Sequence, residues 1–410
     1  MSKSAFSVLL GSSVMAQAIL IAGSVLFARL YHPDAFGALA QVVAVASIVT
    51  VVAGMRFDHM AFACAPDKQA IFFGAAFGIM LLVTMALLLT VAAVAWHDRQ
   101  TGIEWMWIAL FTAANGCYYL CSQWQLAAGE YPAFGRVRVI QAVLQLSIGV
   151  ALYSALPSHG MLVAALASQA AAAMLVVAGA SARRIVVWRR ATLDCVRTNV
   201  KAAGVNSLAT LLQYATPFAP MIVGPFFFTN SEVGAYFLFA SAVAAPWAVL
   251  RRAILGYFNG EMGAPGRLGA MPAALAARYR SWLVPALLMA CAALAAVHAN
   301  ANWIVRLVFG TAWESYAALL APLLAFFALD TLLQPFSTFL GMWGRERSQV
   351  LIELLRFALT FAVWPALVAV AELDFLEAVL VYLTLMLAVY MLNAAVVLRL
   401  ARQPDQLALG

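Results

Sequence analysis

The stretch ARLYHPDAFGA, residues 28–38, joins two apolar segments that are each long enough to cross a membrane. A stretch with a similar order of residue types, PFFFTNSEVGA, residues 225–235, joins two further apolar segments. Both place turn or capping residues and an acid shortly before a glycine that opens the next segment, which suits a helix N-terminus. Their matching places in the two halves of the chain predict one design used twice.

Reading outward from these stretches gives twelve apolar segments of about 20 residues or more, enough for a hydrocarbon core. The chain is 65% apolar and only 10% charged, whereas a soluble domain is about 25% charged. The sequence therefore predicts an all-α polytopic membrane protein with twelve transmembrane helices. They are expected at 5–31, 36–56, 69–96, 103–127, 136–156, 160–181, 203–228, 233–258, 280–300, 316–341, 350–371 and 375–399.

The positive charges are distributed unevenly between the loops. If the N-terminus is cytoplasmic, the even-numbered connections and both termini hold 21 of the 24 Lys and Arg residues, and only Arg29, Arg99 and Arg306 fall on the other side. Lys and Arg are retained on the cytoplasmic face during insertion, so both termini are predicted to be cytoplasmic. The net charge of +7 follows from this bias, with some attraction to anionic lipids, and does not indicate a nucleic-acid partner. The first segment is too long for a signal-peptide core of roughly 7–15 residues and is expected to remain as an anchor.

The two halves are expected to have the same orientation, because six is an even number of spans. Residues 1–182 form the predicted N-terminal six-helix lobe, and residues 203–400 form the C-terminal one. A basic cytoplasmic linker, 183–202, joins them, and 401–410 form a cytoplasmic tail. A second echo supports the repeat: Gly129-Glu130 precedes the fifth segment as Gly344-Arg345-Glu346 precedes the eleventh. Transporters with such repeats often bind substrate at the repeat interface.

Short blocks spread over residues 5–395 carry a resemblance to a known family. The chain resembles the O-antigen and exopolysaccharide flippases (Wzx-like) of the multidrug/oligosaccharidyl-lipid/polysaccharide exporter superfamily. The blocks are ARLY through FG at 28–37, MRFD at 55–58 with Ala61, RVIQ at 138–141, EVGAY at 232–236 with Pro246, FGTAW at 309–313, Gly344-Arg345 and ELLR at 353–356. No single block is specific; their order and spacing carry the likeness.

The resemblance implies two six-helix lobes around a central cavity. It further implies transfer of an undecaprenyl-diphosphate-linked oligosaccharide from the cytoplasmic to the periplasmic leaflet of a bacterial inner membrane, by alternating access. The expected partners are this lipid-linked substrate, membrane lipids and other membrane proteins of polysaccharide assembly. The family pattern contains no catalytic signature, so it supplies no catalytic residue.

No metal-binding spacing, nucleotide-binding loop or nucleophile motif occurs among the scattered cysteines and histidines, so we expect no cofactor, no metal and no enzymatic activity. Two alternatives stay open. One is a small-molecule or drug exporter on the same scaffold. The other is a membrane polysaccharide polymerase, which the chain disfavours because its longest outer connection, 301–315, offers only Arg306 and Glu314 as charged side chains.

Four arginines are candidates for binding the diphosphate headgroup. Arg56 ends the second predicted span, and Arg251 and Arg252 occupy the matching place near the end of the eighth. The planar guanidinium binds phosphate oxygens bidentately. The alternative is ordinary anchoring at a cytoplasmic helix end. Arg29 lies on the outer side, where it either receives the headgroup late in the cycle or pairs with the nearby Asp34.

Asp330 is an acidic residue deep within the tenth predicted span. A charge at the bilayer centre costs about 2.5–3.5 kcal/mol on insertion scales, so we expect this side chain to face the cavity or a partner. It is a candidate for proton or cation coupling or a partner for a cavity arginine; the alternative is a packing residue. Glu353 and Arg356, three residues apart on the eleventh span, are expected to pair on one helix face.

Overall fold

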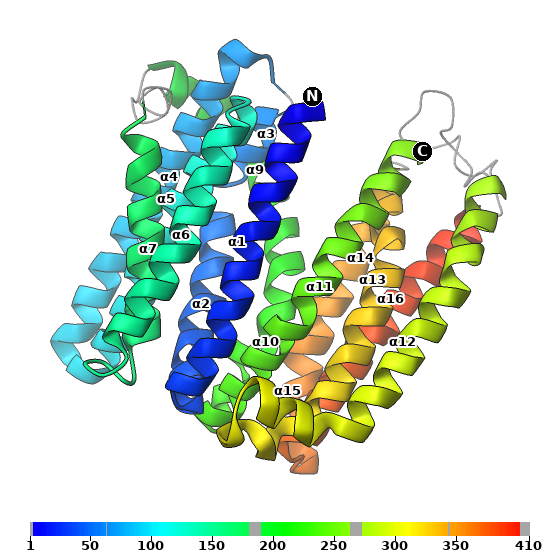
Figure 1. Cartoon of the computed structure of the whole chain (residues 1–410). Helices are drawn as coiled ribbons and strands as arrows, with labels where there is room; N and C mark the ends of the chain where they lie inside the picture. The colour runs from blue at the N-terminus through cyan, green and yellow to red at the C-terminus, as the bar shows by residue number, and fades with distance from the viewer. Residues whose placement is uncertain (1–2, 63, 180–189, 263–272, 343–344, 402–410) are drawn as a thin grey trace. The chain divides into compact units, whose positions relative to one another are not determined.

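The structure, a computed structural model, describes residues 3–62, 64–179, 190–262, 273–342 and 345–401. Almost all of these residues lie in helices, and no strand occurs among them, so the predicted all-α class is confirmed. The chain divides into two compact units, residues 1–222 (unit 1) and residues 223–410 (unit 2) (Figure 1). Residues 183–189 of the predicted linker and 402–410 of the predicted tail lie outside the described residues, while 190–202 of the linker are described.

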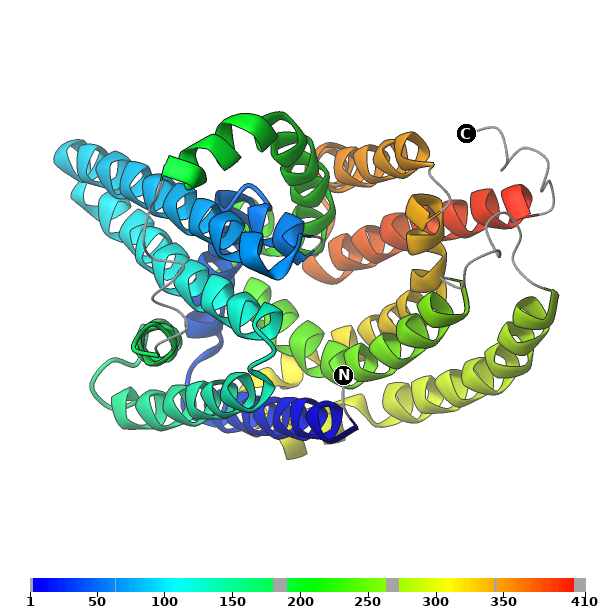
Figure 2. The same ribbon diagram turned by 90° about the horizontal axis from the view of Figure 1, so that it is seen from above.

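Unit 1 is a bundle of long helices joined by short turns. Its elements are α1 (Lys3–Leu30), α2 (Pro33–Ala53), α3 (Phe57–Phe62), α4 (Pro66–His97), α5 (Arg99–Ala127), α6 (Tyr131–Leu152), α7 (Gly160–Val177), α9 (Arg190–Ala215), η1 (Thr216–Phe218) and α10 (Ala219–Ile222). Helix α6 lies between α1 and α7, and α5 packs on α2, α4 and α7 (Figures 1 and 2). The first six spans of the sequence analysis correspond to α1, α2, α4, α5, α6 and α7.

Prolines define where several of these helices begin. Pro33 and Pro66 stand at the first positions of α2 and α4, and Pro132 lies in the first turn of α6. A proline fits there because the first N–H groups of a helix have no intrahelical acceptor. The turn after α5 contains Gly129 at φ +74°, a left-handed conformation that glycine adopts without steric cost. In the stretch 28–38, α1 ends at Leu30 and α2 begins at Pro33. The second helix thus starts at the proline, four residues before Gly37.

Unit 2 is a second helical bundle. Its elements are η2 (Gly224–Phe226), α11 (Asn230–Met262), α12 (Ala273–Val308), η3 (Thr311–Leu319), α13 (Leu320–Met342), α14 (Glu346–Ala358), η4 (Leu359–Val363), α15 (Trp364–Ala371) and α16 (Phe375–Ala401). Helix α13 packs on α11, α12, α14 and α16, which makes it the central helix of this unit.

In the described part of unit 2, two of the long helical paths depart from regular α-helical geometry. Helix α12 has one residue outside helical backbone angles, Asn300, and bends there. The segment α14–η4–α15 continues as one path, but Leu359–Val363 is a π-helical turn. Pro365 lies two residues after the turn, and a proline in a continuing α-helix clashes with the carbonyl four residues earlier. The wider π turn relieves that clash, because its hydrogen bonds run five residues back.

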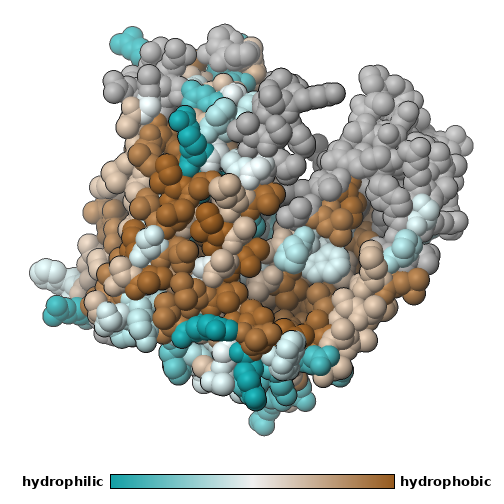
Figure 3. Space-filling view, in the orientation of Figure 1, coloured by the Kyte–Doolittle hydropathy of each residue, from teal (hydrophilic) through white to brown (hydrophobic). Residues whose placement is uncertain are grey.

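Nine helical segments in the described part of the chain are long and apolar enough to cross a membrane. They cover 11–30, 33–53, 68–97, 131–152, 160–177, 288–308, 311–333, 347–371 and 375–399. Apolar side chains cover the middle of the unit 1 helices in the view of Figure 3, and hydrophilic ones gather toward their ends. Large exposed residues such as Leu89 and Val205 fit a lipid environment. Twelve spans and the cytoplasmic termini stay predictions.

The predicted span 203–228 is not one continuous helix. Helix α9 ends at Ala215, and the short elements η1, α10 and η2 follow. Pro217, Pro220 and Pro225 lie in this stretch, and each lacks the N–H that a continuing helix needs. Helix α9 begins within the predicted linker at Arg190 and packs on α2 and α4. The lobe boundaries 1–182 and 203–400 stay a prediction.

Candidate functional site

The turn between α2 and α3 holds Arg56 in an unusual backbone conformation. Met55 and Arg56 have φ values of 45° and 56°, in the left-handed region that side chains other than glycine rarely adopt. Such residues cost of order 1 kcal/mol or more and persist only where surrounding contacts hold them. Here Phe57 and Asp58, which follow immediately, are both buried. The packing of α3 on α4 and α5 thus fixes the turn.

Arg56 belongs to a polar cluster inside unit 1. Its Nη1 donates to the Tyr119 hydroxyl at 3.3 Å, and that hydroxyl donates to Asp58 Oδ2 at 2.8 Å. The three residues Arg56, Asp58 and Tyr119 form the unit 1 polar cluster. A neutral hydroxyl therefore stands between the cation and the carboxylate. A guanidinium has five N–H donors, and within the described residues the Tyr119 bond uses one of those on Arg56.

His59, next to this cluster, lies in the turn region between the second and third spans. Its pKa is lowered by burial and by the positive charge of Arg56, while Asp58 acts in the opposite direction. The neutral imidazole is thus favoured beside Arg56, and His59 adds little positive charge to the cluster at neutral pH.

Arg29 lies far from Arg56 within the same unit. It is exposed on the last turn of α1, while Arg56 follows the end of α2. The 21 residues of α2 separate them, about 30 Å at 1.5 Å per residue. Asp34, the partner considered for Arg29, accepts a hydrogen bond from His32 Nδ1 at 3.1 Å when that nitrogen carries the proton. Unit 1 therefore does not bring its two candidate headgroup arginines together, and the role of Arg29 stays a prediction.

Arg251 and Asp330 form an ion pair inside unit 2. Helix α11 carries Arg251, α13 carries Asp330, and Nη1 lies 2.9 Å from Oδ2. The Asp330 side chain is 5% exposed and that of Arg251 36% exposed. An arginine partner for Asp330 is thus present, as one of the sequence-based interpretations expected. Arg252 is the next residue of α11, but its side chain is outside the described ones.

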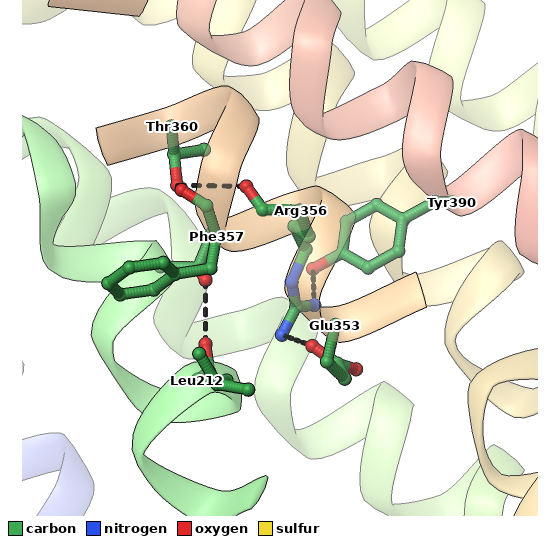
Figure 4. Close-up of polar contacts among 7 residues, drawn as sticks. Leu212, Glu353, Arg356, Phe357, Thr360 and Tyr390 are labelled. Carbon is green, nitrogen blue, oxygen red and sulfur yellow. Dashed lines mark hydrogen bonds and ion pairs between the residues drawn. The ribbon is translucent and has the colours of Figure 1, made fainter. Parts of the chain in front are cut away.

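A second ion pair lies close to the first. Arg356 pairs with Glu353 three residues earlier on α14, which confirms the predicted pairing. Arg356 Nη1 also donates to the Tyr390 hydroxyl of α16 at 3.4 Å, and its Cζ lies 5.7 Å from the centre of the Tyr390 ring (Figure 4). The Tyr390 hydroxyl and the positive charge of Arg356 also act electrostatically on the Asp330 carboxylate, which is hydrogen-bonded through Oδ2 to Arg251. We call Arg251, Asp330, Glu353, Arg356 and Tyr390 the unit 2 polar cluster.

A side chain within the π turn stabilises that turn, which begins three residues after Arg356. Thr360 is completely buried, and its hydroxyl donates to the carbonyl of Arg356 at 3.0 Å (Figure 4). Trp364, at the end of the turn, donates from Nε1 to the carbonyl of Ala378 at 2.8 Å. These bonds anchor the backbone on which Glu353 and Arg356 stand.

The sequence predicts Glu353 and Arg356 as a pair, and it does not point to three other residues of these clusters, Asp58, Tyr119 and Tyr390, by themselves. Asp58 follows the end of a span, where charged residues are ordinary, although it lies within the MRFD block of the family likeness. Tyr119 and Tyr390 lie within long helices in which a tyrosine gives no pattern of its own. One sequence signal could have identified Asp58 as a site residue. It is the presence of two opposite charges, Arg56 and Asp58, close together at the end of a predicted span.

Each cluster combines guanidinium groups with carboxylates inside an apolar helical unit. A charge held there is expensive unless it is paired, so its presence indicates a function or a tightly specified structure. Guanidinium N–H groups suit phosphate or carboxylate oxygens, and carboxylates suit cations or protons. Among the described residues, the unit 2 polar cluster holds two cations and two anions.

No family model and no curated protein sequence matches the chain. Several solved structures share its fold. A MATE multidrug transporter, DinF-BH, is similar at a TM-score of 0.65 with 12% identity, over 96% of this chain and 95% of that one. An inward-facing MATE multidrug resistance transporter of the MOP superfamily has a TM-score of 0.58 and 13% identity, over 94% and 96%.

A third similar structure is a MOP superfamily transporter from Pyrococcus furiosus, described by a binding pocket of reversed polarity. Its TM-score is 0.53 and its identity 13%, over 100% of both chains. At these identities the likeness shows the fold. Together with the nine apolar helical segments found in the described residues, it shows that the chain is a multi-pass membrane protein with the fold of the MATE transporters of the MOP superfamily.

Proposed function

We propose that this protein is a flippase that moves an undecaprenyl-diphosphate-linked oligosaccharide from the cytoplasmic to the periplasmic leaflet during surface polysaccharide synthesis. The observation that carries the proposal is the pair of guanidinium-bearing clusters inside the apolar units, around Arg56 and around Arg251. The transporter fold and the family likeness of the short sequence blocks support it.

The chemistry of the substrate explains why arginines are needed. A diphosphate and a hydrated sugar do not enter hydrocarbon unaided, whereas the polyprenyl tail remains in the bilayer. Arg56 and Arg251 would bind the phosphate oxygens through guanidinium N–H groups that the Tyr119 and Asp330 contacts leave available. Arg252 would add a further cation, and Arg29 would meet the headgroup on the outer side. Rocking of two lobes would expose the headgroup site to each leaflet in turn.

The remaining parts of the proposal follow from this substrate. The protein would act in a bacterial inner membrane, with membrane lipids and the other membrane proteins of polysaccharide assembly as partners. It would work as a transporter and would form or break no covalent bond, so neither a catalytic residue nor a cofactor is assigned.

The test uses a strain that lacks this protein, in which lipid-linked saccharides are extracted and surface polysaccharide is stained. We expect completed lipid-linked units to accumulate on the cytoplasmic leaflet and the polymer to disappear. Arg56→Gln and Arg251→Gln should restore much less polymer than the wild type at matched expression. The matched control is Arg306→Gln, which removes an arginine from an exposed ion pair and should restore polymer fully.

Other outcomes would contradict the flippase. Single saccharide units that reach the periplasm without being polymerised would indicate a polymerase. Normal lipid intermediates together with normal polymer would exclude both polysaccharide functions.

A small-molecule exporter is the second candidate. The specific observation in its favour is that solved structures with this fold are multidrug transporters. The buried carboxylates of Asp58 and Asp330 would then attract a cationic compound. Loss of resistance to cationic dyes in the deletion strain, with unchanged polysaccharide, would favour this candidate over the flippase.

A further inference from the structure

The Arg251–Asp330 pair is unequal in exposure. The carboxylate is nearly fully buried, whereas about a third of the guanidinium side chain stays exposed. The pair uses one donor nitrogen, Nη1, of Arg251. An incoming anion can therefore reach Arg251 while Asp330 is still bound to it. The two anions would compete for one cation.

Asp330 has two further polar neighbours, carried by helices that pack on α13. The Tyr390 hydroxyl and the positive charge of Arg356 both act on its carboxylate, in addition to Arg251. A buried carboxylate without a partner is costly, so an Asp330 that leaves Arg251 needs another donor close by. Tyr390 and Arg356 supply it from α16 and α14, the two helices that pack on α13 and on each other.

Glu353 completes the balance of charges. It pairs with Arg356 and so keeps that cation from holding Asp330 as strongly as Arg251 does. The resting partner of Asp330 is therefore Arg251, and the Tyr390–Arg356 side is the alternative. This arrangement differs from an isolated ion pair, which has no second position for its carboxylate.

We infer that Asp330 is an internal competitor of the anionic headgroup for Arg251, which yields the guanidinium to the diphosphate by turning toward Tyr390 and Arg356 and reclaims it on release. The inference rests on the proposed function and deepens it, because it assigns the release of the headgroup to a residue of this chain. Two phosphates displace one carboxylate because they offer more charge and bidentate contacts. The returning carboxylate then limits how tightly the headgroup is held, which favours turnover over storage.

The experiment measures binding of geranylgeranyl diphosphate to the purified full-length protein in detergent, with geranylgeraniol as the uncharged control lipid. Asp330→Asn removes the competing charge and keeps the shape of the side chain, so we expect binding about tenfold tighter than wild type. Arg251→Gln should weaken binding about tenfold. In the double variant, Asp330→Asn should no longer tighten binding. Glu314→Gln, which removes a carboxylate from the same unit outside the cluster, should bind as wild type does.

In cells, Asp330→Asn should export less polymer than wild type although it binds the diphosphate more tightly. A variant that merely folds poorly would lose both binding and export. Asp330→Ser serves as a second neutral replacement, so that either variant that gives monodisperse protein decides the test.

The results separate failure of this inference from failure of the proposed function. If Arg251→Gln weakens binding but the neutral Asp330 variants bind as wild type or more weakly, Asp330 is no competitor and the inference is overturned, while the headgroup site stands. If the wild type binds geranylgeranyl diphosphate no better than geranylgeraniol, the headgroup site itself is wrong and the inference is overturned with it.

Discussion

The two units solve the same problem, a charged arginine inside an apolar bundle, in different ways. In unit 1 the Tyr119 hydroxyl separates Arg56 from Asp58, whereas in unit 2 Arg251 and Asp330 touch directly. The backbone differs too, because Arg56 lies in a left-handed turn after α2 while Arg251 lies within the continuous helix α11. The positive charge of Arg56 is therefore less fully compensated than that of Arg251, because a hydroxyl separates Arg56 from its carboxylate.

The predicted repeat pairs a neutral residue of unit 1 with the acidic residue of unit 2. Asn115 and Asp330 each stand 14 residues before the glycines of the second echo, Gly129 and Gly344. In unit 1, Asn115 donates to the Thr50 hydroxyl of α2 at 3.2 Å, a neutral contact. In unit 2, Asp330 instead accepts from Arg251 of α11, which lies 17 residues after Gly234, whereas Thr50 lies 13 residues after Gly37. An asparagine at this place makes a neutral hydrogen bond in unit 1, where the aspartate of unit 2 makes an ion pair.

The largest expected effect comes from breaking the fully buried pair of unit 2. Arg356→Met leaves Glu353 as an uncompensated buried charge, and we expect the free energy of unfolding to fall by about 3–5 kcal/mol. Denaturant titration of the purified protein measures this. The double variant Glu353→Leu with Arg356→Met, which buries no charge, should recover most of the loss. A double variant as unstable as the single one would show that packing, rather than charge, accounts for the effect.

A smaller difference is expected between the two headgroup candidates. Arg251→Gln removes the direct partner of Asp330 and should cost about 2 kcal/mol, less than a fully buried pair because the guanidinium is partly exposed. Arg56→Gln should cost about 1 kcal/mol, since Asp58 keeps the Tyr119 hydroxyl. The same titration compares them. Equal losses would remove the distinction between a direct and a bridged pair.

The hydroxyl bridge of unit 1 can be removed by itself. Tyr119→Phe should lower the free energy of unfolding by about 0.5–1 kcal/mol, the usual size of a hydrogen bond between membrane helices. Tyr153→Phe is the control, because this tyrosine is exposed at the end of α6. If Arg56→Gln costs as much in the Tyr119→Phe background as in the wild type, the hydroxyl does not couple Arg56 to Asp58.

The smallest effect is expected at the exposed ion pair of unit 2. Arg306 holds Glu314 through two hydrogen bonds of 2.6 and 2.9 Å, but the Arg306 side chain is largely exposed and that of Glu314 partly exposed. Glu314→Gln should leave the midpoint of thermal unfolding unchanged within error, because surface pairs contribute little. A clear downward shift would mean that exposure is a poor guide to the value of an ion pair in this fold.

The sequence predicts the helices of this fold far better than their pairing. Apolar runs locate α2, α4 and α6, because lipid requires long apolar helices. Each of these helices begins three to five residues before the predicted span, because a proline suits the first helical turn and the apolar run alone does not mark it. Asp330 is identified by its cost within a span. Its contact with Arg251, 79 residues away, depends on the packing of α11 on α13, which no local pattern specifies.

The sequence predicts the candidate site only in part, because it does not specify which helices pack together. It points to Arg251 and Asp330 separately, and the structure brings them into contact. Arg29 and Arg56 instead lie beyond opposite ends of α2. Tyr119 and Tyr390 contribute through their hydroxyls, and a tyrosine in an apolar helix is as common in packing as in recognition. Pro365 is the one local sequence signal of the π turn. It lies within a continuous apolar run, which predicts an uninterrupted helix.

The π turn at Leu359–Val363 also acts as a one-residue insertion in the helix that carries Arg356 and Trp364. A π turn takes up one residue more than an α turn, so residues on opposite sides of it are rotated by about 100° relative to a regular helix. A related chain that lacked one residue here would form an unbroken helix and present either Arg356 or Trp364 to a different neighbour. An alignment with such a chain needs a gap within 359–363. A one-residue deletion there would change the backbone little, because the helix would continue, but it would change which residues contact each other.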